Sequence, residues 1–289
     1  MYTIDAALVK QFNADIILLS QQKGSKLRGA VLLKTGIVGE TDYLDQIGKT
    51  AAVLRTTRHG DTPTVDTEYQ RRKIDIVDYD WGDYLDKADK RKMLADPTNK
   101  YTINASYALG RALDDEIITR AFATAYIGKE GGATVAMHTA NTIAVGASGL
   151  TVNKLLAAKK ILDNADVDAD EPRYIAHTGT QLQDLLKEDK VTNADYNAIR
   201  ALVRGDVNTF LGFTFIMIST TLLDTDSDDY RRVICWAKNG LGLGLGSEID
   251  SDISIDIKKN LATLVQAHIS CGASRLDEDK VVEIKCLET

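Results

Sequence analysis

The stretch that comes nearest to a ligand-binding motif is Gly48-Lys49-Thr50, which matches the end of a phosphate-binding loop. The complete loop also needs a glycine five residues before Gly48, because only then does the backbone fold around a phosphate. Tyr43 stands at that position. We therefore interpret the stretch as an ordinary loop. A nucleotide-dependent enzyme is the weakest of the three functions that we consider for this sequence.

Two runs of alternating aspartates resemble the first half of a calcium-binding loop. They consist of Asp166, Asp168 and Asp170, and of Asp224, Asp226 and Asp228. A calcium loop needs a glycine at its sixth position for the turn and a glutamate at its twelfth to bind the ion. Glu171 and His177 occupy these positions in the first run, and Asp229 and Cys235 in the second. We predict two solvated acidic turns and no metal site.

Histidine, cysteine and serine are too scattered to predict a reaction centre. The four histidines are His59, His138, His177 and His268, so a metal site would have to be assembled from distant parts. Cys235, Cys271 and Cys286 are odd in number and form no C-x-x-C pair, and we interpret them as reduced thiols. No serine lies in a G-x-S-x-G turn. We expect no catalytic residue, no cofactor and no metal.

Composition and charge exclude several further classes. Of 289 residues, 44% are apolar and 27% are charged, which is ordinary for a globular protein and excludes a disordered chain. The net charge of −7 argues against a dedicated nucleic-acid-binding protein. The N-terminal residues lack the pattern of a signal peptide, and no apolar run has the ~20 residues that span a bilayer. We expect a soluble protein that is made in cytoplasm and has no membrane partner.

Residues 1–39 form a basic arm in this acidic chain, with five cations against two acids and a helix predicted over 6–19. Residues 40–78 then have the pattern of a long β-hairpin, with strands at 51–57 and 65–77 and a turn between them. Both faces of this hairpin are largely polar, so it is marginal alone in water. We expect it to lie on its own body or on another subunit.

A long amphipathic helix is predicted over about 104–127. Apolar residues recur every four positions from Leu109 onward, which gives the helix one continuous apolar stripe. Asn104 or Ser106 is the expected N-cap, and Gly128 is expected to end the helix. A helix of this length would be a structural backbone for the molecule.

The remainder of the chain mixes short strands and helices. Strands are predicted at 135–145, 174–176, 213–218, 233–237, 241–245, 264–271 and 281–287, and helices at 152–162, 182–186 and 198–203. Between 240 and 246 glycines alternate with leucines, which places all the glycines on one face of a strand. We expect another backbone to approach that bare face closely.

The order of these elements, together with three stretches of sequence, resembles the major capsid proteins of tailed bacteriophages with the Hong Kong 97-like fold. The stretches are Lys73-Ile74-Asp75-Ile76 before Ala108-Leu109-Gly110-Arg111, Arg173-Tyr174-Ile175-Ala176 before Leu211-Gly212-Phe213, and Val265-Gln266-Ala267-His268 before Val281-Val282-Glu283-Ile284. They are similar, in that order, to the junction of extended loop and spine helix, to the axial domain, and to the closing strands of the peripheral domain. The likeness covers nearly the whole chain.

The resemblance implies an α+β fold with an N-terminal arm, an extended β-hairpin loop, a peripheral domain with the spine helix, and an inserted axial domain. By this likeness the arm is 1–39 and the extended loop is 40–78. The peripheral domain is 79–163 together with 258–289, and the axial domain is 164–257. Some relatives crosslink their subunits through a lysine and an asparagine, but no residue here matches that chemistry.

The resemblance also implies a function. Hexamers and pentamers of this chain would assemble into the icosahedral head shell of a tailed bacteriophage and enclose double-stranded DNA without specific recognition. Scaffold and portal proteins are the expected partners, and the protein would end in the virion after assembly in the host cytoplasm. A nanocompartment shell of the same fold, with an enzyme as cargo, is the main alternative.

Two sets of charged residues are candidates for contacts in such a shell. The extended loop carries the candidates for intersubunit ion pairs, Arg55, Arg58, Asp61, Glu68, Arg71 and Arg72. The arm carries Lys23, Lys26 and Arg28, which we expect on the inner face, toward DNA or a scaffold. Single surface ion pairs contribute little, so a shell would depend on many weak contacts whose effects multivalency combines.

Overall fold

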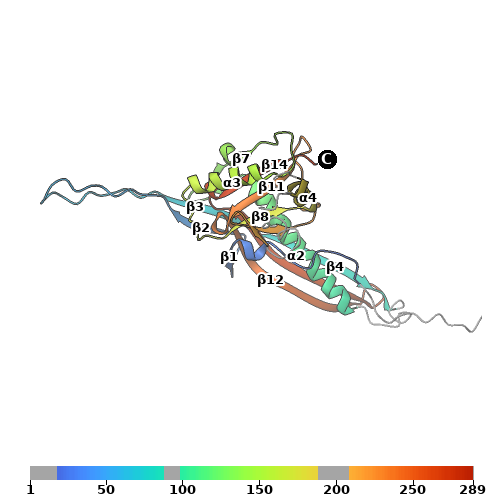
Figure 1. Ribbon diagram of the computed structural model, residues 1–289. Coiled ribbons are helices and arrows are strands. Elements are labelled where there is room, and N and C mark those ends of the chain that lie inside the picture. Colours follow the sequence, from blue (N-terminus) through green and yellow to red (C-terminus); the bar gives the residue numbers. More distant parts are fainter. Residues whose placement is uncertain (1–17, 88–97, 188–207, 289) are drawn as a thin grey trace, which may run out of the picture.

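The computed structural model describes residues 18–87, 98–187 and 208–288. The predicted helix at 198–203 and nearly all of the predicted helix at 6–19 lie outside these ranges. Within them the chain forms an elongated body of helices and sheets from which one long hairpin projects (Figure 1). Strands come from distant parts of the sequence, so the order of elements along the chain differs from their order in the sheets.

A long sheet and one long helix form the first layer pair of the body. The sheet has the order β1 (Leu32–Thr35), β12 (Leu241–Asp256), β13 (Ala262–Arg275) and β4 (Val77–Leu85). Helix α2 (Thr98–Phe122) packs on β13. Its apolar stripe, which includes Leu109 and Leu113, is buried in one core with Ala267 and Ile269 of the sheet. The predicted spine helix is therefore confirmed, and burial of its stripe is what holds it on the sheet.

The bounds of that helix differ from the prediction at both ends. It already includes residue 98, so Asn104 and Ser106 lie inside it and neither is the N-cap. It ends at Phe122 rather than at Gly128, because the chain turns there into strand β5 (Ala125–Ile127), which pairs with the hairpin. Its 25 residues span about 37 Å at 1.5 Å per residue.

A second, six-stranded sheet forms the other part of the body. Its order is β7 (Thr142–Ile143), β14 (Val281–Cys286), β11 (Arg231–Ala237), β8 (Arg173–His177), β10 (Phe213–Met217) and β9 (Thr209–Phe210). Helices α3 (Val152–Asn164) and α4 (Gly179–Lys187) lie in sequence between strands β7 and β10 of this sheet. The predicted strands near 174, 213, 233 and 281 and the helices near 152 and 182 are confirmed. The prediction was correct because each of these segments has a run of apolar residues that is buried in the structure.

Strand pairing crosses two of the predicted domain boundaries. Strand β12 was expected in the axial domain, yet it pairs with β1 and β13 in the long sheet. Strand β14 was expected in the peripheral domain, yet it pairs with β11 in the six-stranded sheet. The predicted strand at 135–145 is also replaced by β6 (Ala133–Val135), a 3-10 turn and the short β7. The closing segment therefore ties the two sheets together instead of completing one domain.

The hairpin forms a small sheet of its own at its base. Strands β2 (Thr41–Ile47) and β3 (Tyr69–Asp75) pair antiparallel, and β5 and β6 extend them. The hairpin is therefore confirmed, but the strand predicted at 51–57 is wrong, since residues 48–68 contain no strand. Every residue from 49 to 66 is exposed, and the segment points away from the body (Figure 1). With neither face buried, no packing stabilises strand pairing there.

The alternating glycines let the base of the hairpin lie directly on the long sheet. Gly244 of β12 pairs with Gly272 of β13, so two bare positions stand side by side. A Cβ on Gly244 would lie 2.5 Å from Ile37, and a Cβ on Gly272 would overlap the carbonyl of Asp75 in β3. At Gly244 the bare face is therefore filled by isoleucine side chains of the same chain, and the closest backbone approach is at Gly272, outside the predicted run of glycines.

Replacing Gly272 with alanine should displace the hairpin base and lower the free energy of unfolding by about 1–3 kcal/mol, because overpacking forces backbone to move. Gly82 in strand β4 is the matched control, since a Cβ there meets only Leu264 at 3.8 Å. Urea unfolding of both variants measures the difference. Equal effects of Gly272→Ala and Gly82→Ala would contradict this account of the crossing.

Candidate assembly surfaces

The basic arm is fastened to the spine helix by one buried carboxylate. Asp114 of α2 is fully buried and accepts hydrogen bonds from the Gln22 and Ser25 side chains at 2.5 Å each. It also accepts from the backbone amides of Lys26 at 2.9 Å and Leu27 at 3.1 Å. A carboxylate that receives this many donors fixes the course of the chain across the helix.

The same crossing is shaped by a glycine and an arginine of the helix. A Cβ on Gly110 would lie 2.6 Å from the backbone of Gly24, so only glycine lets the arm pass this close. Arg111 donates to the Gln21 side chain at 2.8 Å and to the Gln22 carbonyl at 3.3 Å. The sequence analysis did not predict this contact. The signal in the sequence was an aspartate within an amphipathic helix, and pattern alone cannot tell whether such an aspartate is buried or exposed.

Two of the three arm cations have partners within the chain. Lys26 donates to the carbonyl of Met217, at the end of β10, at 2.6 Å. Arg28 donates through both terminal nitrogens to Glu248 of β12, at 2.8 and 2.5 Å. Lys23 is exposed and has no ionic partner among the described residues. The arm thus connects both sheets, and the expectation that these cations face DNA or a scaffold stays a prediction.

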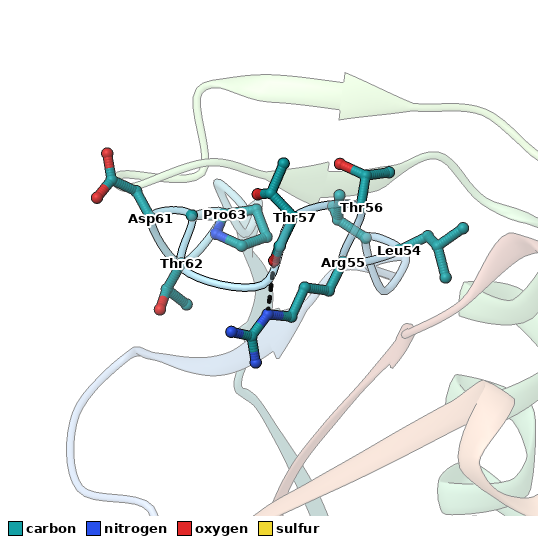
Figure 2. A pocket seen from close by; sticks show the side chains of 9 residues that line it. Leu54, Arg55, Thr56, Thr57, Asp61, Thr62 and Pro63 are labelled. Atoms are coloured by element: carbon teal, nitrogen blue, oxygen red, sulfur yellow. Dashed lines mark hydrogen bonds between the residues drawn. The ribbon is translucent and has the colours of Figure 1, made fainter.

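The tip of the hairpin is a polar loop around a shallow hollow. Figure 2 shows Leu54 and Asp61 pointing away from it, while the Arg55 side chain folds back toward Thr57. Arg55 donates to the carbonyl of Thr57 at 3.0 Å and to that of Arg58. Arg58 and Asp61 are exposed, and Glu68 accepts from the Gln70 side chain at 2.9 Å. Four of the predicted contact residues therefore lie on the projecting loop with their charges in solvent.

Arg71 forms a cross-strand pair at the base of the hairpin. It donates to Asp45 of β2 at 2.6 Å and lies over the Tyr43 ring at 5.4 Å. The hydrogen bond from Arg71 lowers the pKa of the Asp45 carboxyl. Both groups stay largely exposed, so the pair contributes little to stability. Whether Arg71 also contacts a neighbouring subunit stays a prediction.

Arg72 is not available to a neighbouring subunit, and that prediction is corrected. It is 4% exposed and donates through both terminal nitrogens to Glu278 of the same chain, at 2.8 and 2.6 Å. It also donates to Gln46 at 3.2 Å. Alternation along β3 turns Arg72 inward while Arg71 stays outward, because successive strand residues face opposite sides.

Glu278 connects this arginine to a second buried one. Arg275 of β13 is fully buried and lies 3.6 Å from Glu278. It donates to the carbonyls of Ala121 and Ala123 at 2.8 Å and of Val135 at 3.0 Å. The carbonyls at the end of α2, which have no partner inside the helix, are thus capped by a cation. The cluster of Arg72, Arg275 and Glu278 therefore joins the hairpin, the spine helix α2, strand β6 and the C-terminal segment that contains Glu278.

The motifs tested for chemistry have structural roles. Lys49 pairs with Asp166 at 3.2 Å, with both side chains exposed. Asp226 accepts from the amides of Asp228 and Tyr230 at 3.0 Å and pairs with Lys285 at 2.6 Å, so its run is a turn closed by its own carboxylate. In the described part of the chain, no three His, Cys, Asp or Glu side chains gather as metal ligands. No described helix is long and apolar enough to cross a membrane.

Comparison with solved structures finds the same architecture in phage capsids. The capsid of cyanophage P-SCSP1u has a TM-score of 0.76 at 14% identity, over 100% of this chain and 96% of that one. The capsid of Ralstonia phage GP4 has a TM-score of 0.73 at 11% identity, over 98% and 96%. Cyanophage Pam1 gives 0.71 at 14% identity, over 97% and 96%.

Sequence comparison gives the family directly. No curated protein matches the chain. The family model described as phage capsid protein, in contrast, matches residues 4–288. With the sheets, spine helix and projecting hairpin already described, the chain belongs to the phage capsid protein family and has the Hong Kong 97-like fold.

Proposed function

We propose that this chain is the major capsid protein of a tailed bacteriophage and assembles, as hexamers and pentamers, into the icosahedral head shell around double-stranded DNA. Membership of the capsid family supports the shell itself. The observation that carries the proposal is the loop at 48–68, which has no strand and projects into solvent over its whole length. In a single chain this segment has nothing to pack against.

The exposed apolar side chains of that loop support a neighbouring subunit as the missing surface. Val53 is 57% exposed, Leu54 84% and Val65 46%. Each would gain roughly 25 cal/mol per Å² of apolar area removed from water. Contacts of this size are weak singly, so a misplaced subunit can leave, and their number stabilises the closed shell.

The inside of the shell is the proposed location of the arm. Lys23, Lys26 and Arg28 would face the packaged DNA or a scaffold, with Lys23 the freest of the three among the described residues. Scaffold and portal proteins are further proposed partners during assembly in the host cytoplasm. The protein would work without turnover, as a container.

Replacing residues 51–66 by a short Gly-Ser turn tests the proposal. Strands β2 and β3 stay intact, so we expect a folded subunit with an unchanged core and complete loss of shells in negative-stain images. Thr62→Ala with Thr64→Ala is the control, because it keeps the loop length and should still assemble. Intact shells from the shortened loop would refute the role given to it. Shells of wild-type protein that hold an enzyme instead of DNA would favour the nanocompartment.

A further inference from the structure

Short 3-10 helices connect the six-stranded sheet to the rest of the subunit. Within the described residues the chain passes three times between these two parts, and each passage contains a 3-10 helix of three residues. They are η3 (Thr139–Asn141), η4 (Lys238–Gly240) and η5 (Glu278–Lys280). Short connectors of this kind often act as hinges, because a few residues absorb the change in backbone angle between rigid elements. The three helices therefore define a joint between the two sheets.

Hydrogen bonds and close packing hold the three helices of this joint together. The carbonyl of Gly240 in η4 accepts from the amide of Leu276, just before η5, at 2.8 Å. The Asn141 side chain in η3 donates to the carbonyl of Glu278 in η5 at 2.7 Å. A Cβ on Gly240 would lie 2.8 Å from the Cβ of Lys280, so η4 and η5 approach each other closely. A change of angle at one helix therefore involves the other two.

One carboxylate bridges two helices of the joint. Glu171, which directly precedes Pro172 and strand β8, accepts from the amide of Asn239 in η4 at 2.9 Å. It also accepts from Nζ of Lys280 in η5 at 2.9 Å, and both side chains of this ion pair are largely buried, with 11% and 24% exposed. The carbonyl of Pro172 accepts from the amide of Lys238 at 3.0 Å. Since η4 leads into β12 and η5 follows β13, Glu171 ties the long sheet to the six-stranded sheet.

A shell built from one chain needs a subunit whose two sheets can adopt a defined angle. Hexamers and pentamers would place the same chain at different angles to its neighbours. Packed cores do not deform continuously, so a change of shape is taken up at the connectors between rigid elements. In this chain those connectors are η3, η4 and η5, and the carboxylate that bridges η4 and η5 limits their movement.

We propose that Glu171 sets the angle between the long sheet and the six-stranded sheet, and thereby the curvature and the diameter of the shell. It is a positioning residue, because it acts through η4 and η5. With its charge in place, the ion pair with Lys280 holds one angle, and without that charge the joint samples a wider range. The link to shell diameter rests on the proposed function, whereas the angle itself belongs to the single subunit.

Spin-label distances in the unassembled subunit test the angle without any shell. Asp83→Cys on β4 and Asn164→Cys at the end of α3, which packs on β14, place one label on each part, and both native residues are exposed. The three native cysteines are buried and stay unlabelled. We expect one narrow distance distribution, and a clearly broader one when Glu171→Gln is added. Asp170→Asn is the matched control, because it removes the charge of the exposed neighbour and should leave the distribution narrow.

Lys280→Gln tests the same ion pair from its other side and keeps the proposal testable if Glu171→Gln fails to fold. It should broaden the distribution equally, and the double variant should broaden it no further, because the two groups act as one pair. Shells of either variant should vary in diameter in negative-stain images, where wild-type shells are uniform.

Two results on the unassembled subunit would overturn the proposal. They are distributions as narrow as the wild-type one in both Glu171→Gln and Lys280→Gln, and equal broadening by Asp170→Asn. Broadened distances together with uniform shells would refute the link from the angle to the diameter. Absence of shells from wild-type protein would instead count against the proposed function and leave the distance measurement unaffected.

Discussion

Replacing Asp114 with alanine is expected to release the N-terminal arm from the spine helix and to lower the free energy of unfolding by about 3–5 kcal/mol. The carboxylate is fully buried and receives four hydrogen bonds from residues 22–27. Without it, the amides of Lys26 and Leu27 lose their acceptor in a site that excludes water. An unsatisfied buried donor costs more than the hydrogen bond itself contributes.

Urea unfolding measures the loss of stability, and limited trypsin digestion measures release of the arm. Cleavage after Lys23, Lys26 and Arg28 should become much faster in the Asp114→Ala variant. Asp115→Ala is the control, because Asp115 is the exposed neighbour on the same helix, and it should change stability by no more than about 0.5 kcal/mol. Arm cleavage at the wild-type rate in Asp114→Ala would show that other contacts hold the arm.

The body of the fold was predictable because it buries periodic apolar runs. The apolar stripe of α2 and the apolar runs in β8, β10 and β11 can each be recognised in the sequence from the spacing of their apolar residues. Sheet membership was not predictable in the same way. Strand β12 pairs in the long sheet and strand β14 in the six-stranded sheet, the reverse of the predicted assignment. Nothing local in either strand specifies its partner.

The assembly surfaces were predictable only in part, for two physical reasons. Arg71 and Arg72 are adjacent and chemically identical, yet one is partly exposed to solvent and the other pairs with Glu278, a partly buried glutamate 206 residues away. Burial of a polar side chain depends on such distant partners, so sequence pattern did not identify Asp114 or Glu278. The strand predicted at 51–57 failed for the opposite reason, because its pattern lacks a packing surface within one chain.

Replacing Glu278 with alanine should have an effect comparable to that of Asp114→Ala and detach the hairpin base from the body. Glu278 accepts hydrogen bonds from both terminal nitrogens of Arg72 and lies 3.6 Å from Arg275. Burial already lowers the pKa of Arg275, so its charge is costly without a partner. Removing this carboxylate leaves two buried guanidinium groups with no ionic partner among the described residues, a loss of about 3–5 kcal/mol.

Arg72→Met separates the two effects, since it removes one charge and leaves Glu278 with Arg275. Its destabilisation should therefore be smaller than that of Glu278→Ala, and Asp279→Ala, on the exposed neighbour, should be nearly neutral. Hydrogen exchange at β2 and β3 reports the hairpin separately from global unfolding, and both strands should exchange faster in Glu278→Ala. If Arg72→Met destabilised as strongly as Glu278→Ala, the cluster would act through the Arg72 contact alone. Arg275 would then cap the end of α2 without needing Glu278.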